Sequence, residues 1–288
     1  MIKFKLPELD LSQYKKLYCG KETRLATATS VSFVDYNTIL VPSLLGKKIY
    51  LIDINNNSFN IIDEIDCGVY IDLIDFKDNT IITANALSPE HIDGSISIFK
   101  LENRKIKFIK EIIVKKNLRV HGCRFIDNDN IIVASNDKLN SGIYFINLNT
   151  NEHTNYVKFN DRVKDILIKD DKLLIITSEN APTKNGEYID NNSTLYIYDL
   201  QSMKKLGELV FEGQVDSICM NDNNGFITVQ GKHSLLHFEL NGNELIYKKY
   251  ISGFNFPHGI ATMDDKVIIT NYGDNSVDIY ELEELIKD

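Results

Sequence analysis

The chain has 288 residues, of which 43% are hydrophobic and 25% are charged, an ordinary balance for a globular protein. Its formal net charge of −9 argues against binding to nucleic acid or to an acidic membrane surface, because both kinds of binding need a basic surface. We find no apolar run long enough for a secretory signal or a membrane span, and the four cysteines form neither a CxxC metal motif nor a dense disulfide framework. We therefore expect a reduced, cytoplasmic protein.

One strand pattern recurs along the chain after a first strand-like segment, IKFKL, at residues 2–6. It alternates apolar and polar residues, and each copy ends with a charged or polar residue followed by Ile or Leu. Its copies are KIYLIDI (48–54), SISIFKL (95–101), GIYFINL (142–148), TLYIYDL (194–200), SLLHFEL (234–240) and SVDIYEL (276–282). The last residues of successive copies are 47, 47, 52, 40 and 42 residues apart, which is the period of a four-stranded propeller blade.

Each repeat contains the same order of segments. A strand such as VYIDLIDF comes first, a very apolar strand such as TIITAN comes second, and the alternating strand is third. The fourth strand is more polar, as in KIKFIKEIIV, which suits a solvated outer edge. Asp, Asn and Gly between the segments favour tight turns. Helical periodicity is absent apart from a last turn at LEELIKD.

These repeats predict an all-β fold, a six-bladed β-propeller that occupies residues 1–288 as a single domain. The predicted blades are residues 24–66, 67–115, 116–160, 161–212, 213–252 and 253–282, the last completed by strand 2–6. Pairing of strand 2–6 with 276–282 would close the ring and remove two exposed sheet edges. A seven-bladed ring is the main alternative, although we count no seventh repeat.

The first strands of all blades begin at the same end of a propeller channel, so one residue per blade is expected to face the axis there. Alignment of the repeats on their apolar second strands places six residues at this position, which we call the start ring: Thr29, Asp72, His121, Lys164, Asp216 and His258. Two imidazoles and two carboxylates around one axis suit a divalent metal, with His121, His258, Asp72 and Asp216 as ligands. Zinc, manganese and iron fit mixed nitrogen and oxygen ligands, and calcium would need oxygen ligands only.

Lys164 argues against a metal, because an ammonium group beside a cation is unfavourable unless an anion lies between them. A polar channel in which Lys164 pairs with Asp72 or Asp216 is the alternative. The glycines after the two histidines, Gly122 and Gly259, are expected to allow a sharp turn into the strand or a close approach of the backbone to a ligand.

A second ring of polar residues ends the second strands, and its amides would suit a polar small molecule unless they only start turns. Its members are Ser43, Asn85, Asn136, Asn180, Gln230 and Asn271. Two long connections, 85–95 and 178–193, lie at the same end, and the second is interpreted as a candidate lid. His91 and His233 lie in connections at this end, and each is interpreted either as an extension of the site or as an exposed histidine.

The segment VIITNYGDNSVDIYEL resembles the YVTN type of propeller repeat, and FPHGIA resembles the blade start of lactonase-like, NHL-like and streptogramin-lyase-like propellers. The resemblance is specific for the sixth blade, fair for the third, and thin elsewhere. It implies an enzyme with a metal at the channel mouth or a binding module without catalysis. The Glu of gluconolactonase-like ligand sets and the third His of peptide-amidating lyases have no counterpart in the start ring.

The sequence therefore favours a metal-dependent hydrolase or lyase, lactonase-like, that acts on a small polar metabolite. Asp72, Lys164 and Asp216 are its candidate catalytic residues, and Asn85, Asn136, Asn180, Gln230 and Asn271 its candidate ligand-binding residues. A non-catalytic propeller that binds a protein or peptide partner is the alternative. A metal-free enzyme with Asp72 or Asp216 as general base is the third interpretation.

Overall fold

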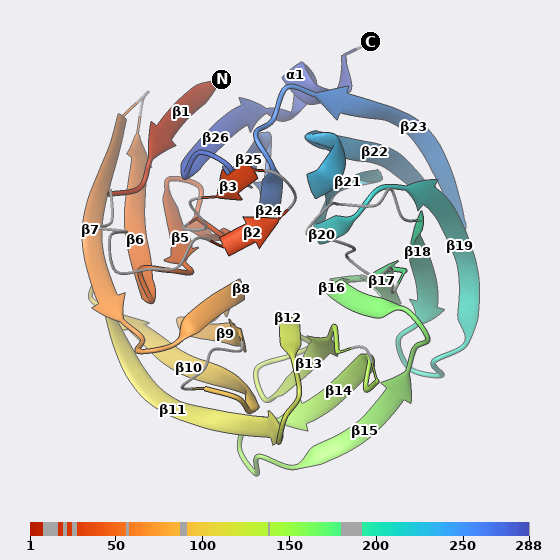
Figure 1. Cartoon of the computed structure of the whole chain (residues 1–288), viewed down its shortest axis with the longest axis horizontal. Helices are drawn as coiled ribbons and strands as arrows, with labels where there is room; N and C mark the ends of the chain where they lie inside the picture. Colours follow the sequence, from red (N-terminus) through yellow and green to blue (C-terminus); the bar gives the residue numbers. More distant parts are fainter. Residues whose placement is uncertain are drawn as a thin grey trace.

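The structure, a computed structural model, describes residues 1–7, 17–19, 22–24, 28–55, 58–86, 91–137, 139–179 and 192–287. For 17–19, 22–24 and 154–155 it describes the backbone only. Within these ranges the chain forms six four-stranded antiparallel sheets arranged around a central axis (Figure 1). The predicted six-bladed β-propeller is thus confirmed, and the seven-bladed alternative is excluded.

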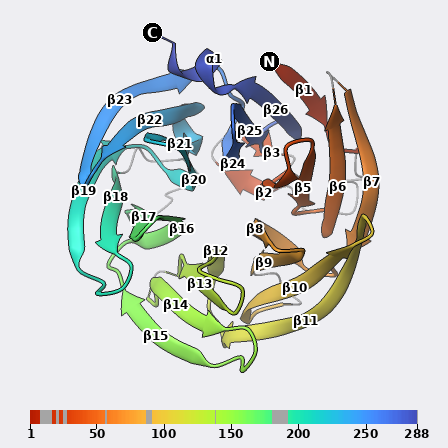
Figure 2. The ribbon, with the colours of Figure 1, turned by 180° about the vertical axis from the view of Figure 1, so that it is seen from behind.

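The blades follow one another in chain order, each with its first strand nearest the axis and its last strand at the rim (Figures 1 and 2). The first three blades consist of β4–β7 (Ser32–Asp35, Thr38–Ser43, Lys48–Asn55, Ser58–Asp66), β8–β11 (Tyr70–Lys77, Thr80–Ala86, Gly94–Glu102, Lys105–Lys115) and β12–β15 (Val120–Phe125, Asn130–Ser135, Gly142–Asn147, His153–Lys158). The next two consist of β16–β19 (Arg162–Lys169, Lys172–Ser178, Asn192–Asp199, Lys205–Glu212) and β20–β23 (Val215–Asn221, Asn224–Val229, Ser234–Asn241, Glu244–Ser252). The sixth contains β24 (Pro257–Met263), β25 (Lys266–Asn271), β26 (Ser276–Glu281) and β1 (Ile2–Lys5).

Burial explains the different character of the strands within a blade. The second strand is covered on both faces by neighbouring blades, so β5 and almost all of β9 are buried. The outermost strand has one solvated face, and β11 accordingly alternates exposed and buried residues along much of its length. Two-residue hairpins such as Asp78–Asn79 and Asn103–Arg104 have positive φ at both residues, the geometry that matches the twist of the flanking strands.

The first strand of the chain closes the ring as predicted. β1 pairs antiparallel with β26, with Phe4 opposite Val277 and Ile2 opposite Ile279. Phe4 is buried and stacks on Phe59 of the first blade at a ring-centroid distance of 4.3 Å. The closing strand therefore joins the sixth blade to the first through both hydrogen bonds and side-chain packing.

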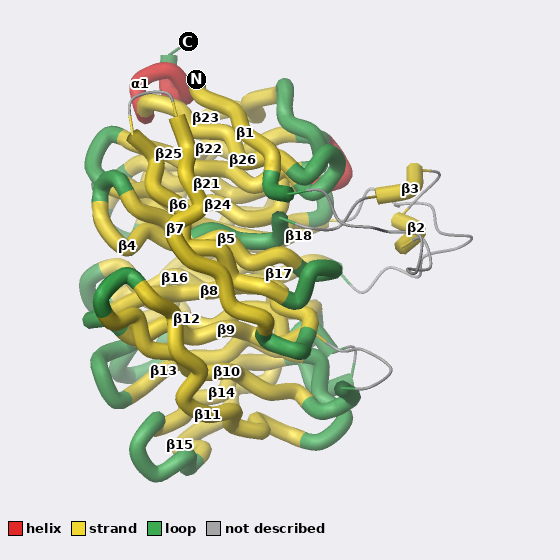
Figure 3. The backbone as a smooth tube through the Cα atoms, turned by 90° about the vertical axis from the view of Figure 1, so that its left-hand side faces the viewer, coloured by secondary structure: helices red, strands yellow, loops and turns green. Residues whose placement is uncertain are grey.

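Two smaller elements accompany the propeller. A short helix, α1 (Leu282–Ile286), ends the chain where the sequence predicts a last turn. β2 (Leu17–Cys19) and β3 (Glu22–Arg24) pair with each other and project from one face of the ring (Figure 3). Among the described residues, α1 is far too short to cross a membrane, and no other helix qualifies.

Candidate functional site

The start ring is assembled in the channel as the alignment predicts. All six of its side chains are buried, with exposed fractions between 0% for Thr29 and 6% for Asp72. Ligand atoms of Asp72, His121 and His258 all lie within 4.8 Å of one another. On the other side of this cluster, Lys164 Nζ lies 2.8 Å from Asp216 Oδ1, and the same oxygen lies 3.5 Å from Nε2 of His121.

Local irregularities in the inner strands coincide with these residues. In each of blades two to six, the pairing between the first and second strands shifts register at the start-ring residue, as between Val120 and Gly122 around His121. A β-bulge frees a residue from regular pairing and changes the direction of its side chain. These five β-bulges therefore release the five ionisable side chains from regular strand pairing at the same level of the channel.

The two histidines are held in the same way by neighbouring backbone. Nδ1 of His121 lies 2.8 Å from the carbonyl oxygen of Lys164, and Nδ1 of His258 lies 2.6 Å from the carbonyl oxygen of Thr29. A carbonyl only accepts hydrogen bonds, so each Nδ1 carries the proton and donates it. In the neutral ring Nε2 then keeps its lone pair, the arrangement found for metal-binding histidines.

The glycine after each histidine makes this contact possible. A Cβ at Gly259 would lie 2.4 Å from Cα of Ser30 and 2.8 Å from the Thr29 carbonyl oxygen that accepts the bond from His258. A Cβ at Gly122 would lie 3.1 Å from the Lys164 carbonyl oxygen. The geometry gives these glycines a role other than the sharp turn or the approach to a ligand expected from the sequence, because the absence of a Cβ lets the backbone of the neighbouring blade reach the imidazole.

Charge in the ring is unevenly balanced. Burial by itself would raise the pKa of Asp216, but the ammonium group of Lys164, 2.8 Å away, outweighs it and holds this pKa well below its usual range. Burial lowers the pKa of His258, an effect that the nearby Asp216 only partly opposes. Asp216 is therefore ionised and His258 is neutral at neutral pH.

Two carboxylate oxygens in this network lack hydrogen-bond donors. Oδ2 of Asp72 and Oδ2 of Asp216 are buried and have no partner among the residues that the structure describes. A buried carboxylate oxygen without a donor is costly, and such a group is usually compensated by a cation or a bound donor. The ring thus has coordinating capacity that its own side chains do not use.

Two members of the predicted amide rim are engaged within their own blades. The side-chain amide nitrogen of Asn85 donates to Ser95, Ser97 and Glu111, and that of Asn271 donates to Ser276. Asn136 is buried and its Oδ1 has no partner among the described residues, while Gln230 is buried in a short 3₁₀ turn. Asn180 and most of the 178–193 connection lie outside the described residues.

The other two histidines of this face have local roles. His91 contacts the Ser95 hydroxyl at 2.8 Å and Glu111 at 3.2 Å, in the same network as Asn85. His233 accepts the backbone N–H of Phe256 at 3.2 Å and packs edge-on against the Phe256 ring. Neither the Ser95 and Glu111 contacts of His91 nor the Phe256 contacts of His233 involve the start ring.

An aromatic neighbour of the site was not anticipated. The ring of Tyr272 stacks on His258, with centroids 5.0 Å apart and 18° between the planes. Tyr272 also packs with Tyr70 against the apolar cluster of Leu44, Leu45 and Ala86. The sequence places Tyr272 close to the site, because it directly follows Asn271 in the NYGD turn. Its stacking on His258, however, depends on how this turn folds over the start of the first strand.

Comparison with known proteins identifies the fold alone. No protein-family model and no curated protein matches this sequence. Hydrazine synthase of Kuenenia stuttgartiensis contains a similar chain, with 12% identity, a TM-score of 0.61, and coverage of 96% of this chain and 99% of that one. A chain of the mitotic checkpoint complex matches with 10% identity, a TM-score of 0.60, and coverage of 98% and 99%.

The propeller of Dos1 is a further structural match, with 14% identity and a TM-score of 0.53 over 92% of this chain and 70% of that one. At such low identities these likenesses support the propeller architecture. The YVTN or NHL-like subfamily suggested by the sequence has no family match behind it.

Proposed function

We propose that the start ring binds one divalent metal ion, through a carboxylate oxygen of Asp72 and Nε2 of both His121 and His258. The observation that carries this proposal is that one ligand atom from each of these three residues lies within 4.8 Å of the other two, with both Nδ1 atoms engaged by backbone carbonyls. Two imidazoles and one carboxylate make a ligand set that zinc prefers. Manganese and iron are compatible with the same atoms.

The charges of the ring also favour a cation. Asp72 and Asp216 contribute two carboxylates, and Lys164 is the one ammonium group of the ring that opposes them. Two carboxylate groups against one ammonium group leave an excess of negative charge in the buried ring, which is unfavourable at low dielectric. A divalent ion would make the net charge of the ring positive, so that an anionic ligand could bind there. Such an anion between the metal and Lys164 would make the ammonium group compatible with the cation.

Three protein ligands leave a coordination position open, which is typical of catalytic rather than structural zinc sites. We therefore infer a metal-dependent hydrolase or lyase, lactonase-like, acting on a small polar metabolite. A metal in such a site lowers the pKa of bound water and polarises a carbonyl group. Asp216, kept ionised by Lys164, is suited to accept a hydrogen bond from a bound water, and Lys164 to balance negative charge that develops on the substrate.

The catalytic part of this proposal is tested by assays of chelated and reconstituted protein. A panel of lactones, esters and hydroxy acids would be assayed after EDTA treatment and after addition of Zn²⁺ or Mn²⁺. We expect turnover only with metal, and its loss in Asp72→Asn, which keeps the shape of the side chain. His237→Ala is the matched control, because His237 is a buried histidine that bonds Asn224 within the fifth blade.

Metal-independent turnover would contradict the proposal, as would equal activity of Asp72→Asn and the unmodified protein. If metal binds but no substrate of the panel turns over, the metal site stands and the lactonase-like reaction is rejected. Binding of a protein partner that survives combined substitution of His121 and His258 would favour the non-catalytic alternative.

A further inference from the structure

A second polar pocket lies at the opposite mouth of the channel. Two residues beyond each start-ring position, the inner strands or their approaches carry an apolar residue that packs in one of the six cores between blades: Val31, Ile74, Cys123, Ile166, Ile218 and Ile260. From this level onward, residues of all six inner strands or their approaches line a pocket of about 300 Å³. The pocket lining contains none of the start-ring residues, so the pocket is distinct from the proposed metal site.

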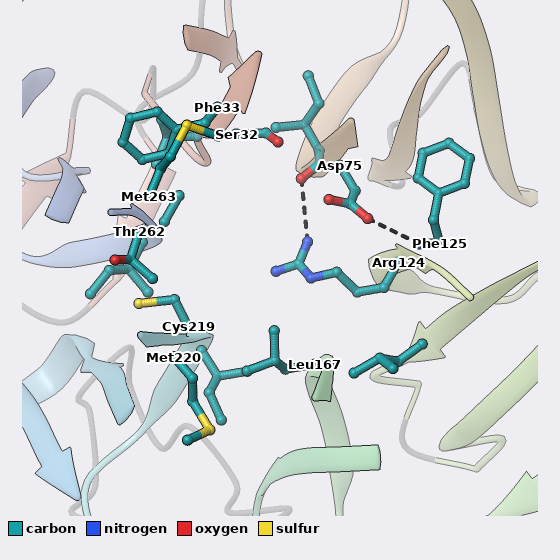
Figure 4. A pocket seen from close by; sticks show the side chains of 16 residues that line it. Ser32, Phe33, Asp75, Arg124, Phe125, Leu167, Cys219, Met220, Thr262 and Met263 are labelled. Atoms are coloured by element: carbon teal, nitrogen blue, oxygen red, sulfur yellow. Dashed lines mark hydrogen bonds between the residues drawn. The ribbon is translucent and has the colours of Figure 1, made fainter. Parts of the chain in front are cut away.

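The guanidinium group of Arg124 points into the middle of this pocket (Figure 4). Its Nη1 donates to the carbonyl oxygens of Ile74 and Cys123, at 3.3 and 3.2 Å, and its Nη2 lies 2.6 Å from Oδ2 of Asp165. A guanidinium has five N–H groups. The second Nη2 hydrogen and the Nε hydrogen thus have no partner among the described residues, and they can hold a carboxylate.

A carboxylate of the protein faces the same pocket. Oδ2 of Asp75 accepts the backbone N–H of Phe125 at 2.9 Å (Figure 4), and the backbone N–H of Phe76 also donates to this carboxylate. The carboxylate oxygens keep lone pairs for a further donor. Although they share the pocket, Asp75 and Arg124 form no ion pair with each other in the described chain. Asp165, by contrast, is fully buried and saturated by Arg124, Ser217 and backbone amides.

The charged groups that line the pocket are therefore one cationic donor, Arg124, and one carboxylate, Asp75. The remaining wall is mainly apolar and includes Phe33, Met220 and Met263 (Figure 4). Methionine side chains adapt to ligands of different shape. The pocket volume is at the lower end of the range of about 300–1,000 Å³ that small-molecule sites occupy.

We propose that this pocket binds a small zwitterion, an α-amino acid with an apolar side chain, with its carboxylate on Arg124 and its ammonium group on Asp75. The apolar side chain of the ligand would then lie against the methionines and Phe33. This site does not depend on the metal at the other mouth. The competing interpretation is that Arg124 only ties the second, third and fourth blades together through Ile74 and Asp165.

Calorimetric titration of the intact protein with leucine, methionine and phenylalanine tests the proposal. Isocaproate, which lacks the amino group, and isoamylamine, which lacks the carboxylate, are matched probes for leucine. We expect saturable binding of at least one amino acid, and we expect each incomplete probe to bind about tenfold or more weakly, because each loses one charged hydrogen bond. If Arg124 has only a structural role, neither the amino acids nor the incomplete probes should bind.

Two substitutions locate the binding. Asp75→Asn retains an oxygen that can accept the Phe125 N–H. It should weaken the binding of leucine about tenfold and leave the binding of isocaproate unchanged. Asp72→Asn, on the same strand but in the start ring, should leave leucine binding unchanged. The proposal is overturned if no amino acid binds, if an incomplete probe binds as well as leucine, or if Asp72→Asn abolishes binding and Asp75→Asn does not.

Discussion

The imidazole rings of His121 and His258 lie nearly parallel in the channel, with centroids 5.8 Å apart and 25° between their planes. They come from the third and sixth blades, which face each other across the axis (Figure 1). Two imidazolium ions this close would repel each other. Because each Nδ1–H is donated to a backbone carbonyl, the Nε2 atoms of the two rings remain to share a cation with Asp72.

The ion pair between Lys164 and Asp216 should be strongly coupled. Removal of one partner leaves the other charge buried, so we expect Lys164→Met or Asp216→Asn alone to destabilise the metal-free protein by about 3–5 kcal/mol. The double variant should cost clearly less than the sum of the two. Urea unfolding of the four proteins measures this coupling, and strictly additive losses would show that the pair does not interact.

The metal-free protein should lose stability on mild acidification because of His258. Its pKa is lowered by burial in the folded state, so the unfolded chain takes up this proton first, below about pH 6.5. The unfolding free energy should therefore fall as the pH decreases from about 7 to 5. His258→Asn, which can still donate to the Thr29 carbonyl, should flatten this dependence.

The matched control for that measurement is His153→Asn, because His153 is exposed at the rim. Denaturant unfolding in EDTA at a series of pH values provides the data. If the slope of unfolding free energy against pH is the same in His258→Asn as in the unmodified protein, the assignment of a neutral buried imidazole is wrong.

Replacement of the glycine by alanine in the two His-Gly pairs should lower stability by different amounts. Gly259→Ala would place a Cβ 2.4 Å from the backbone of Ser30, whereas the nearest atom to a Cβ at Gly122 is 3.0 Å away, on the Asp165 side chain. We expect Gly259→Ala to cost at least about 1–3 kcal/mol, and Gly122→Ala to cost less. Thermal unfolding ranks the two, and the reverse order would disprove the proposed close contact of blades one and six.

Ring closure should depend on one buried aromatic side chain. Phe4 is 4% exposed, and its truncation to Ala is expected to cost about 3–5 kcal/mol. Phe108→Ala removes a similar side chain from the outer strand β11, where it is 54% exposed, and should cost much less. Equal losses of unfolding free energy in the two variants would mean that β1 contributes little to closure.

The architecture could be predicted because a propeller repeats one blade pattern. Strands such as KIYLIDI recur at blade spacing, and an open ring would expose two edges, which identified residues 2–6 as the closing strand. The start ring followed from the same alignment, since equivalent positions of equivalent strands meet at the axis. His121 and His258 were located in this way without any metal motif.

The contacts around those residues could not be predicted in the same way. The carbonyl groups of Thr29 and Lys164 belong to neighbouring blades, and their approach to the histidines depends on the packing angle between sheets. Asn85 could serve a ligand or its own blade, and only the positions of Ser95 and Glu111 reveal the second role. Arg124 was overlooked because a single basic residue in a strand carries no pattern.

Metal titration of the chelated protein tests the central claim most directly. Calorimetry with Zn²⁺ should give one saturable site per chain, lost in the His121→Ala/His258→Ala double variant and retained in His237→Ala. Mass-spectrometric metal analysis of the same samples should agree. Absence of saturable binding by Zn²⁺, Mn²⁺ and Fe²⁺ to the folded protein, or equal binding by the double variant, would contradict the proposed metal site.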